Sequence, residues 1–204
     1  MWEKDGFLKD SVDTNAAMKQ LEIYIESFPI KLKQFSSEEL SKRPAEGKWS
    51  KQEILGHLID SAINNLKRFT EIQFLPQPYT VESYKQNELV IVNDYQNLPL
   101  EHLLDLWQSV NRQIIFVVKA IPADKLNNPV DPQYESRELK TLGWIICDYV
   151  AHMQHHFTQI FPDYLKNKTL FSFEIKNTSY EKNYLIHPVF NIYHKCLCTV
   201  RSCT

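Results

Sequence analysis

The sequence predicts an all-α protein with the architecture of a four-helix bundle. Four stretches of about 20 residues each carry apolar side chains at the spacing of an amphipathic helix. Only four of the 204 residues are glycine, which argues against a β protein rich in glycine turns. Apolar residues make up 43% of the chain, enough for the core of one ordinary domain. No segment shows a convincing strand pattern, so the helices are expected to pack on one another.

The first helix is expected from about Ser11 to Phe35, where apolar residues recur mostly at intervals of three to five. Pro29 lies inside this range and could kink or split the helix. A short capped turn of helix is expected at residues 37–40, and Pro44 ends it.

The second helix has a clear start. Ser50 and Glu53 fit a capping box, and Trp49 could pack as a hydrophobic staple against Ile54. The helix is expected to end near Phe74. Its broad inner face is apolar at first and polar further on: Ile54, His57, Leu58, Ser61, Asn65, Arg68 and Ile72. Asparagine and arginine on an inward face are typical of a helix that lines a site.

Two long connections separate the remaining helices. Residues 76–98 form the first, and connections of this length are usually functional or mobile. Residues 90–92 could form a brief extended piece within it. The third helix is expected from about Pro99 to Ile121, and the second connection from Pro122 to Lys140. The fourth helix should begin near Thr141 and end at Ile160 or Phe161.

The fourth helix carries three of the seven histidines within five residues. His152 and His156 are four positions apart, so both imidazoles lie on one helix face and can point at one metal ion. His57, on the inner face of the second helix, is the best candidate for a third ligand. His155 lies about 100° around the helix and suits a rim position, with His152 and His155 as the second-choice pair.

Three protein ligands are typical of a catalytic metal site, since structural zinc sites are usually closed by four. The ion could act as a Lewis acid, or lower the pKa of a bound water or thiol. Asp60 and Asp148 are candidates to accept the second N–H of a ligand histidine, although each could equally be an ordinary exposed carboxylate. Among the cysteines, Cys147 is expected to be a buried small hydrophobe.

The remaining features narrow the class of protein. The net charge of −2 gives no basic field for nucleic acid, and no membrane span or signal peptide is expected. These patterns favour the cytoplasm. Residues 1–166 are predicted to form the bundle domain, and residues 167–204 a loosely ordered extension. The extension holds a second, weaker metal-binding pattern: His194, Cys196, Cys198 and Cys203.

Several motifs together resemble the DinB/YfiT-like superfamily over residues 11–165. They are Trp49-Ser-Lys-Gln-Glu-Ile-Leu-Gly-His57-Leu-Ile-Asp60-Ser, Arg68-Phe, Trp107-x3-Asn111-Arg112 and His152-x-x-His155-His156-x-x-Gln159-Ile. The resemblance implies a four-helix bundle that holds one divalent ion by three histidines, matching His57, His152 and His156. It also implies that dimers are common, and that members with known activity include transferases and isomerases dependent on bacillithiol, mycothiol or glutathione.

The sequence thus favours a metal-dependent enzyme that transfers a low-molecular-weight thiol to a small-molecule substrate. Three imidazoles suit zinc, nickel, copper or iron alike, and zinc or nickel is the expected ion. Besides Asp60, the polar residues Asn65 and Arg68 are candidates to contact an anionic part of the thiol or substrate; a buried polar network that fixes the bundle is the equal alternative. A hydrolase with metal-bound water and a non-catalytic, stress-associated metal-binding bundle are the rival interpretations.

Overall fold

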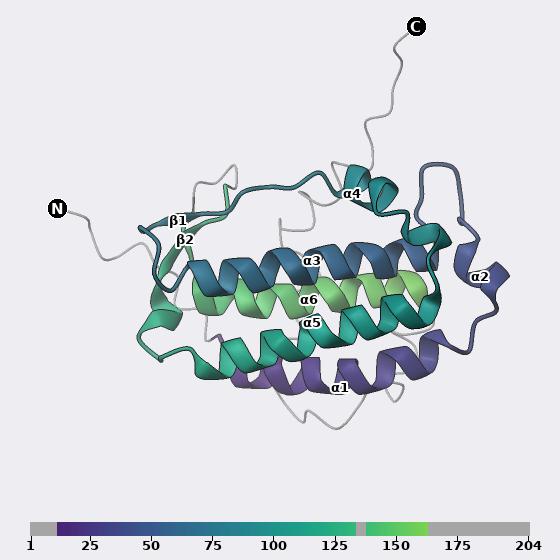
Figure 1. Cartoon of the computed structure of the whole chain (residues 1–204). Coiled ribbons are helices and arrows are strands. Elements are labelled where there is room, and N and C mark those ends of the chain that lie inside the picture. Colours follow the sequence, from purple (N-terminus) through teal and green to yellow (C-terminus); the bar gives the residue numbers. More distant parts are fainter. Residues whose placement is uncertain (1–11, 134–137, 163–204) are drawn as a thin grey trace, which may run out of the picture.

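The computed structural model describes residues 12–133 and 138–162, and its four long helices form one bundle (Figure 1). They are α1 (Thr14–Leu32), α3 (Lys51–Glu71), α5 (Leu100–Ala120) and α6 (Leu142–Ile160). Both α1 and α3 pack against α5 and α6, so the four helices surround a shared core. This arrangement confirms the fold class that the apolar periodicity predicts.

Helix α1 continues through Pro29, so the proline does not split it. A proline has no N–H to donate, which deprives the carbonyl four residues earlier of its helical hydrogen bond. That carbonyl belongs to Ile25, and it accepts a hydrogen bond from Gln108 Nε2 of α5 at 2.9 Å. The neighbouring helix therefore satisfies the group that the proline leaves unpaired.

The predicted capping box at the start of α3 is present. Ser50 Oγ accepts from the Glu53 N–H at 3.1 Å, and the Glu53 carboxylate accepts from the Ser50 N–H at 2.8 Å. Arg43 forms an ion pair with the same carboxylate. The expected short turn of helix is α2 (Ser37–Ser41), which has a capping box of its own. These caps fix where α3 begins, and so fix the height of its side chains in the bundle.

The first long connection contains more structure than predicted. The extended piece expected at residues 90–92 is wrong, because these residues belong to helix α4 (Gln86–Val92), followed by a 3₁₀ turn, η1 (Tyr95–Asn97). The prediction that the chain has no strands is also wrong, because the structure has a small three-stranded sheet. The second connection contains the 3₁₀ turn η2 (Lys125–Asn127) and the strand β2 (Pro129–Asp131) that follows it. This strand pairs in parallel with β1 (Tyr79–Thr80) and antiparallel with β3 (Lys140–Thr141).

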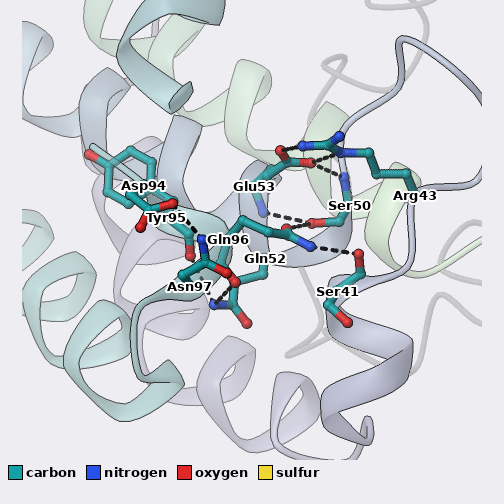
Figure 2. A network of polar contacts seen from close by, with 9 residues as sticks. All are labelled: Ser41, Arg43, Ser50, Gln52, Glu53, Asp94, Tyr95, Gln96 and Asn97. Atoms are coloured by element: carbon teal, nitrogen blue, oxygen red, sulfur yellow. Dashed lines mark hydrogen bonds and ion pairs between the residues drawn. The ribbon is translucent and has the colours of Figure 1, made fainter. Parts of the chain in front are cut away.

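Polar contacts dock the end of this connection onto the start of α3 (Figure 2). Gln52 Nε2 donates to the backbone carbonyl of Tyr95 at 2.8 Å. The Ser50 hydroxyl donates to Gln96 Oε1 at 2.6 Å. Ser50, the N-cap of α3, and Gln52 are both buried, so these bonds are shielded from water and hold η1 beside the helical turns that lead to His57.

The centre of the bundle is aromatic. Phe28 of α1 stacks on Phe157 of α6 with 4.4 Å between ring centroids, and Tyr24 meets Phe157 edge-on at 4.8 Å. Trp107 of α5 closes the cluster, 4.9 Å from Phe28. Cys147 is buried, as predicted. These contacts hold the side of α6 that faces α1 and α5 and leave its other side to face α3.

Some sequence predictions lie outside the described residues. They include the domain boundary at residue 166, the extension 167–204 and its histidine and cysteine cluster. Within the described ranges, none of the helices combines the length and the apolar character that crossing a membrane would require.

Candidate metal centre

The structure brings His57, His152 and His156 together between α3 and α6. The Nε2 atoms of His57 and His152 lie 3.3 Å apart, and those of His156 and His152 lie 3.0 Å apart. One nitrogen from each ring falls within 4.8 Å of the other two. The pair predicted on one helix face and the third histidine predicted across the bundle therefore converge on one point.

This spacing suits a metal ion. Two ligands about 2.0–2.1 Å from one zinc ion, at the tetrahedral angle, are separated from each other by ~3.3 Å. The observed Nε2 separations of 3.0 and 3.3 Å lie close to that value. Three neutral imidazoles that turn their lone pairs toward one another repel unless a cation lies among them. Both the distances and the donor set therefore fit a divalent ion.

Burial keeps the three imidazoles neutral. His57 and His156 are buried, and His152 is half-buried. Burial lowers the pKa of His57 to about 3. The pKa values of His152 and His156 also lie well below the ordinary value, because burial and then the neighbouring imidazoles disfavour their charged forms. Neutral imidazole is the form that binds a metal, so the site is ready to ligate at neutral pH.

Other side chains contact the second ring nitrogens. Gln159 Oε1 lies 2.8 Å from His156 Nδ1 and accepts its N–H, which leaves the Nε2 lone pair facing the centre. Ser61 Oγ lies 3.5 Å from His152 Nδ1. Among the described residues no side chain or backbone group hydrogen-bonds His57 Nδ1, and the Trp49 ring packs 4.8 Å from the His57 ring. Gln159 belongs to the motif that begins at His152, but the sequence did not predict this contact with His156.

Comparisons with known proteins identify the family of this chain. The sequence pattern of the DinB superfamily matches residues 20–160. The chain belongs to the DinB superfamily. It is 24% identical over 153 residues to a protein of Oceanobacillus iheyensis, covering 72% of this chain and 83% of that protein. A protein of Halalkalibacterium halodurans is 25% identical over 130 residues, covering 64% and 74%. Both relatives carry the provisional name of metal-dependent hydrolase.

Two solved structures share the fold of this DinB-superfamily chain. YfiT from Bacillus subtilis, provisionally described as a metal-dependent hydrolase with an unusual four-helix bundle topology, matches with a TM-score of 0.63 at 18% identity. The match covers 82% of this chain and 94% of YfiT. A mycothiol-dependent maleylpyruvate isomerase matches with a TM-score of 0.53 at 14% identity, covering 72% of this chain and 60% of that protein.

Asp60 does not orient a histidine of this DinB-superfamily site. Its Oδ1 accepts hydrogen bonds from the Tyr95 hydroxyl at 2.7 Å and from Asn93 Nδ2 at 3.1 Å. Burial raises the pKa of Asp60, and these two donors oppose the shift. The sequence could not predict this role of Asp60, because its partner Tyr95 lies 35 positions later in the chain, in the turn η1.

Asn65 and Arg68 continue from the triad along the same face of α3. Asn65 Nδ2 donates to the Ser61 carbonyl at 2.9 Å and lies 3.4 Å from Ser61 Oγ. Arg68 donates to the Glu82 carbonyl at 2.8 Å. The two other histidines that the structure describes are not part of the triad. They are His155, which is half-buried with its Nε2 3.0 Å from Gln159 Nε2, and the exposed His102.

Proposed function

We propose that this protein is a divalent-metal-dependent enzyme that holds its ion through His57, His152 and His156. The convergence of the three Nε2 atoms is the observation that carries the proposal. Three protein ligands leave coordination positions for a reactant, which is the arrangement of catalytic rather than structural sites. The provisional names of the two sequence relatives also support metal dependence.

A bound ion would supply Lewis-acid chemistry and would favour the deprotonated form of a water or thiol that it binds. The chain contributes the surroundings. Burial of His57 and His156 keeps bulk water from the ligand nitrogens. Gln159 holds the His156 ring in one tautomer through Nδ1. Zinc and nickel are the ions that we expect, because neutral imidazoles suit both.

The reaction that we favour is transfer of a low-molecular-weight thiol to a small electrophilic substrate. The fold shared with a mycothiol-dependent isomerase supports this choice. So does the buried guanidinium of Arg68, which could take an anionic group of such a thiol. Hydrolysis, with water as the nucleophile, is the second candidate, favoured by the names of the relatives and of YfiT.

Metal analysis of the purified full chain tests the proposal. We expect about one equivalent of zinc or nickel in the wild-type protein, and loss of most of it in His57→Ala, His152→Ala and His156→Ala, because two imidazoles hold an ion far less tightly than three. His102→Ala removes an exposed histidine and serves as the matched control. If the purified protein is free of metal and binds neither added ion, the proposed metal-dependent enzyme is excluded and a non-catalytic bundle is favoured.

A second assay separates thiol transfer from hydrolysis. Metal-loaded protein is incubated with one electrophile and a panel of thiols, and with water alone. Turnover that requires a thiol supports the favoured reaction. Turnover at the same rate in water alone identifies a hydrolase instead.

A further inference from the structure

Arg68 is a buried cation without an ion pair in the described part of the chain. The residue is 8% exposed. One nitrogen donates to the Glu82 carbonyl at 2.8 Å, another lies 3.5 Å from Asn65 Oδ1, and the Tyr84 ring centre lies 5.8 Å from the guanidinium carbon. A guanidinium has five N–H donors. These contacts use two of them, so Arg68 retains donors for another group.

Asp148 is a carboxylate of opposite charge on the facing helix. It is half-buried on α6, and it makes no hydrogen bond or ion pair with the residues that the structure describes. Burial raises the pKa of Asp148 to about 7, while the charges of Lys140 and Arg68 oppose that shift. Lys140 is already engaged, since its Nζ lies 2.9 Å from Glu138. Arg68 and Asp148 are thus close enough to interact without being in contact.

Both groups lie next to the histidine triad. Asp148 precedes His152 by four residues, which is one helical turn or ~6 Å along the same face of α6. On α3, Arg68 contacts Asn65, Asn65 contacts Ser61, and Ser61 Oγ lies 3.5 Å from His152 Nδ1. The two charges therefore lie along the α3–α6 seam, roughly one to three helical turns from the point where the Nε2 atoms meet.

We propose that Arg68 and Asp148 bind an amino-acid-like end of the thiol or substrate. The guanidinium takes its carboxylate and the Asp148 carboxylate takes its ammonium group. A simple anion would satisfy Arg68 but would be repelled by Asp148, and a simple cation would meet the reverse problem. A zwitterion satisfies the buried guanidinium and the half-buried carboxylate at once.

This inference rests on the proposed function, because the triad is where the reacting atom of the same molecule would lie. The separation sets the size of the ligand. A compact amino acid such as cysteine is too short to occupy both places. The class that fits is an extended molecule with its zwitterionic end several bonds from its reacting atom, as in a γ-glutamyl peptide thiol.

Calorimetric titration of the metal-loaded full chain tests the inference. The probes are glutathione, its N-acetyl derivative, and the same tripeptide with a methyl group in place of the thiol. We expect Arg68→Gln and Asp148→Asn each to weaken binding of glutathione and of the methyl analogue tenfold or more. Arg68→Lys should lose less, because it keeps the charge but not the two-pronged geometry. N-acetylglutathione lacks the ammonium, so it should bind wild type more weakly than glutathione does. It should bind Asp148→Asn more tightly than wild type, because the carboxylate that repels its anionic end is gone.

Arg112→Gln and Asp105→Asn, both at exposed positions of α5, are the matched controls. Thermal melting identifies any variant that does not fold. If Arg68→Gln does not fold, the glutathione affinities of Arg68→Lys and Asp148→Asn test the inference instead. Wild-type affinity for glutathione in both Arg68→Gln and Asp148→Asn overturns the inference, as does a wild-type protein that binds none of the probes.

Metal content is measured on the same samples and reports on the proposed function separately. The wild-type protein could fail to bind metal and still bind the methyl analogue in a way that depends on Arg68 and Asp148. That result would support the binding site for the zwitterion and contradict the proposed metal-dependent enzyme. If the protein binds metal but its affinity for glutathione is unchanged by these substitutions, the metal site is supported and the binding site for the zwitterion is contradicted.

Discussion

At the scale of single residues, Gln159 is the side chain best placed to tune the triad. Its Oε1 accepts from His156 Nδ1, and its Nε2 lies 3.0 Å from His155 Nε2. In this orientation the amide nitrogen can donate to His155 Nε2 while the amide oxygen takes the His156 N–H. An acceptor on the second nitrogen of a ligand histidine fixes its tautomer and raises its basicity.

Gln159→Leu is therefore expected to weaken metal binding about tenfold, near the lower end of such effects because the glutamine is exposed. Competition with a coloured chelator measures the affinity. Gln159→Glu keeps an acceptor oxygen and should restore most of it. Gln154→Leu, at an exposed position on the same helix, is the control. Equal affinity in the wild type and Gln159→Leu would show that the His156 ring is held by packing alone.

Asp148 makes a second prediction, for stability against pH. Burial raises its pKa to about 7 from the ordinary aspartate value of 3.8. Below about pH 4 both folded and unfolded chains hold the proton. Between about pH 4 and 7 only the folded chain holds it, so this group makes the free energy of unfolding fall as pH rises. Above pH 7 the folded chain bears the full free-energy cost of ionising Asp148.

Asp148→Asn removes that cost. Metal-free Asp148→Asn should be more stable than wild type at pH 8, by on the order of 2–4 kcal/mol, and similar to it at pH 4. Urea unfolding at the two pH values measures both differences, with Asp105→Asn as an exposed control. A stability difference that does not change with pH would mean that Asp148 is ionised across this range in the folded chain.

At the scale of elements, the docking of η1 on α3 depends on a glycine. A Cβ atom built on Gly56 would lie 2.1 Å from Tyr95 Cδ2 and 2.6 Å from Tyr95 Cβ. Tyr95 is held at both ends, by Gln52 at its carbonyl and by Asp60 at its hydroxyl, so its ring cannot simply move away. Only glycine allows the turn and the helix to approach this closely.

Gly56→Ala should therefore destabilise the protein by about 1–3 kcal/mol, although alanine is the better helix former by ~1 kcal/mol. The matched control is Gly143→Ala, whose Cβ would have 3.4 Å to its nearest neighbours and should be neutral or slightly stabilising. Thermal or urea unfolding compares the two. A stabilised Gly56→Ala would show that η1 detaches from α3 at little cost.

The elements also show what a sequence can and cannot reveal. The four long helices were predictable because each buries one continuous stripe of apolar residues. Helix α4 was not, since only Val90 of its seven residues is buried. The strand β1 has two residues and pairs with β2 about fifty positions later, so neither strand leaves a periodic pattern.

The candidate site divides in the same way. Helical spacing predicted that His152 and His156 share a face, and the inward face of α3 predicted His57. The partners of their second nitrogens were not predictable, because they depend on rotamers and on the crossing of α3 with α6. Asp60 shows this clearly: its spacing from His57 suited a direct contact, but Tyr95 of the docked turn takes its carboxylate instead.

At the scale of the whole molecule, packing and chemistry lie on opposite sides of α6. Phe157 stacks in the aromatic core against α1, whereas the adjacent His156 faces α3. Residues one position apart on a helix differ by about 100° in direction, so one helix can serve both purposes. The aromatic core fixes α6 in place, and the ligands inherit that rigidity, which a site built on loops would lack.

This division leads to a prediction about the limits of the domain. The apolar cluster and the three histidines described above lie within residues 12–133 and 138–162. If residues 1–166 form the domain, as the sequence predicts, a chain that ends after Lys166 should fold, bind the same metal and melt within about 2–4 °C of the full chain, since that range corresponds to ~1 kcal/mol for a protein of this size. A chain that ends after Ala151 loses two ligands and the last turns of α6, and should neither bind metal nor show a cooperative transition. A shorter chain (1–166) that loses its metal or melts far below the full protein would place the boundary of the domain beyond residue 166.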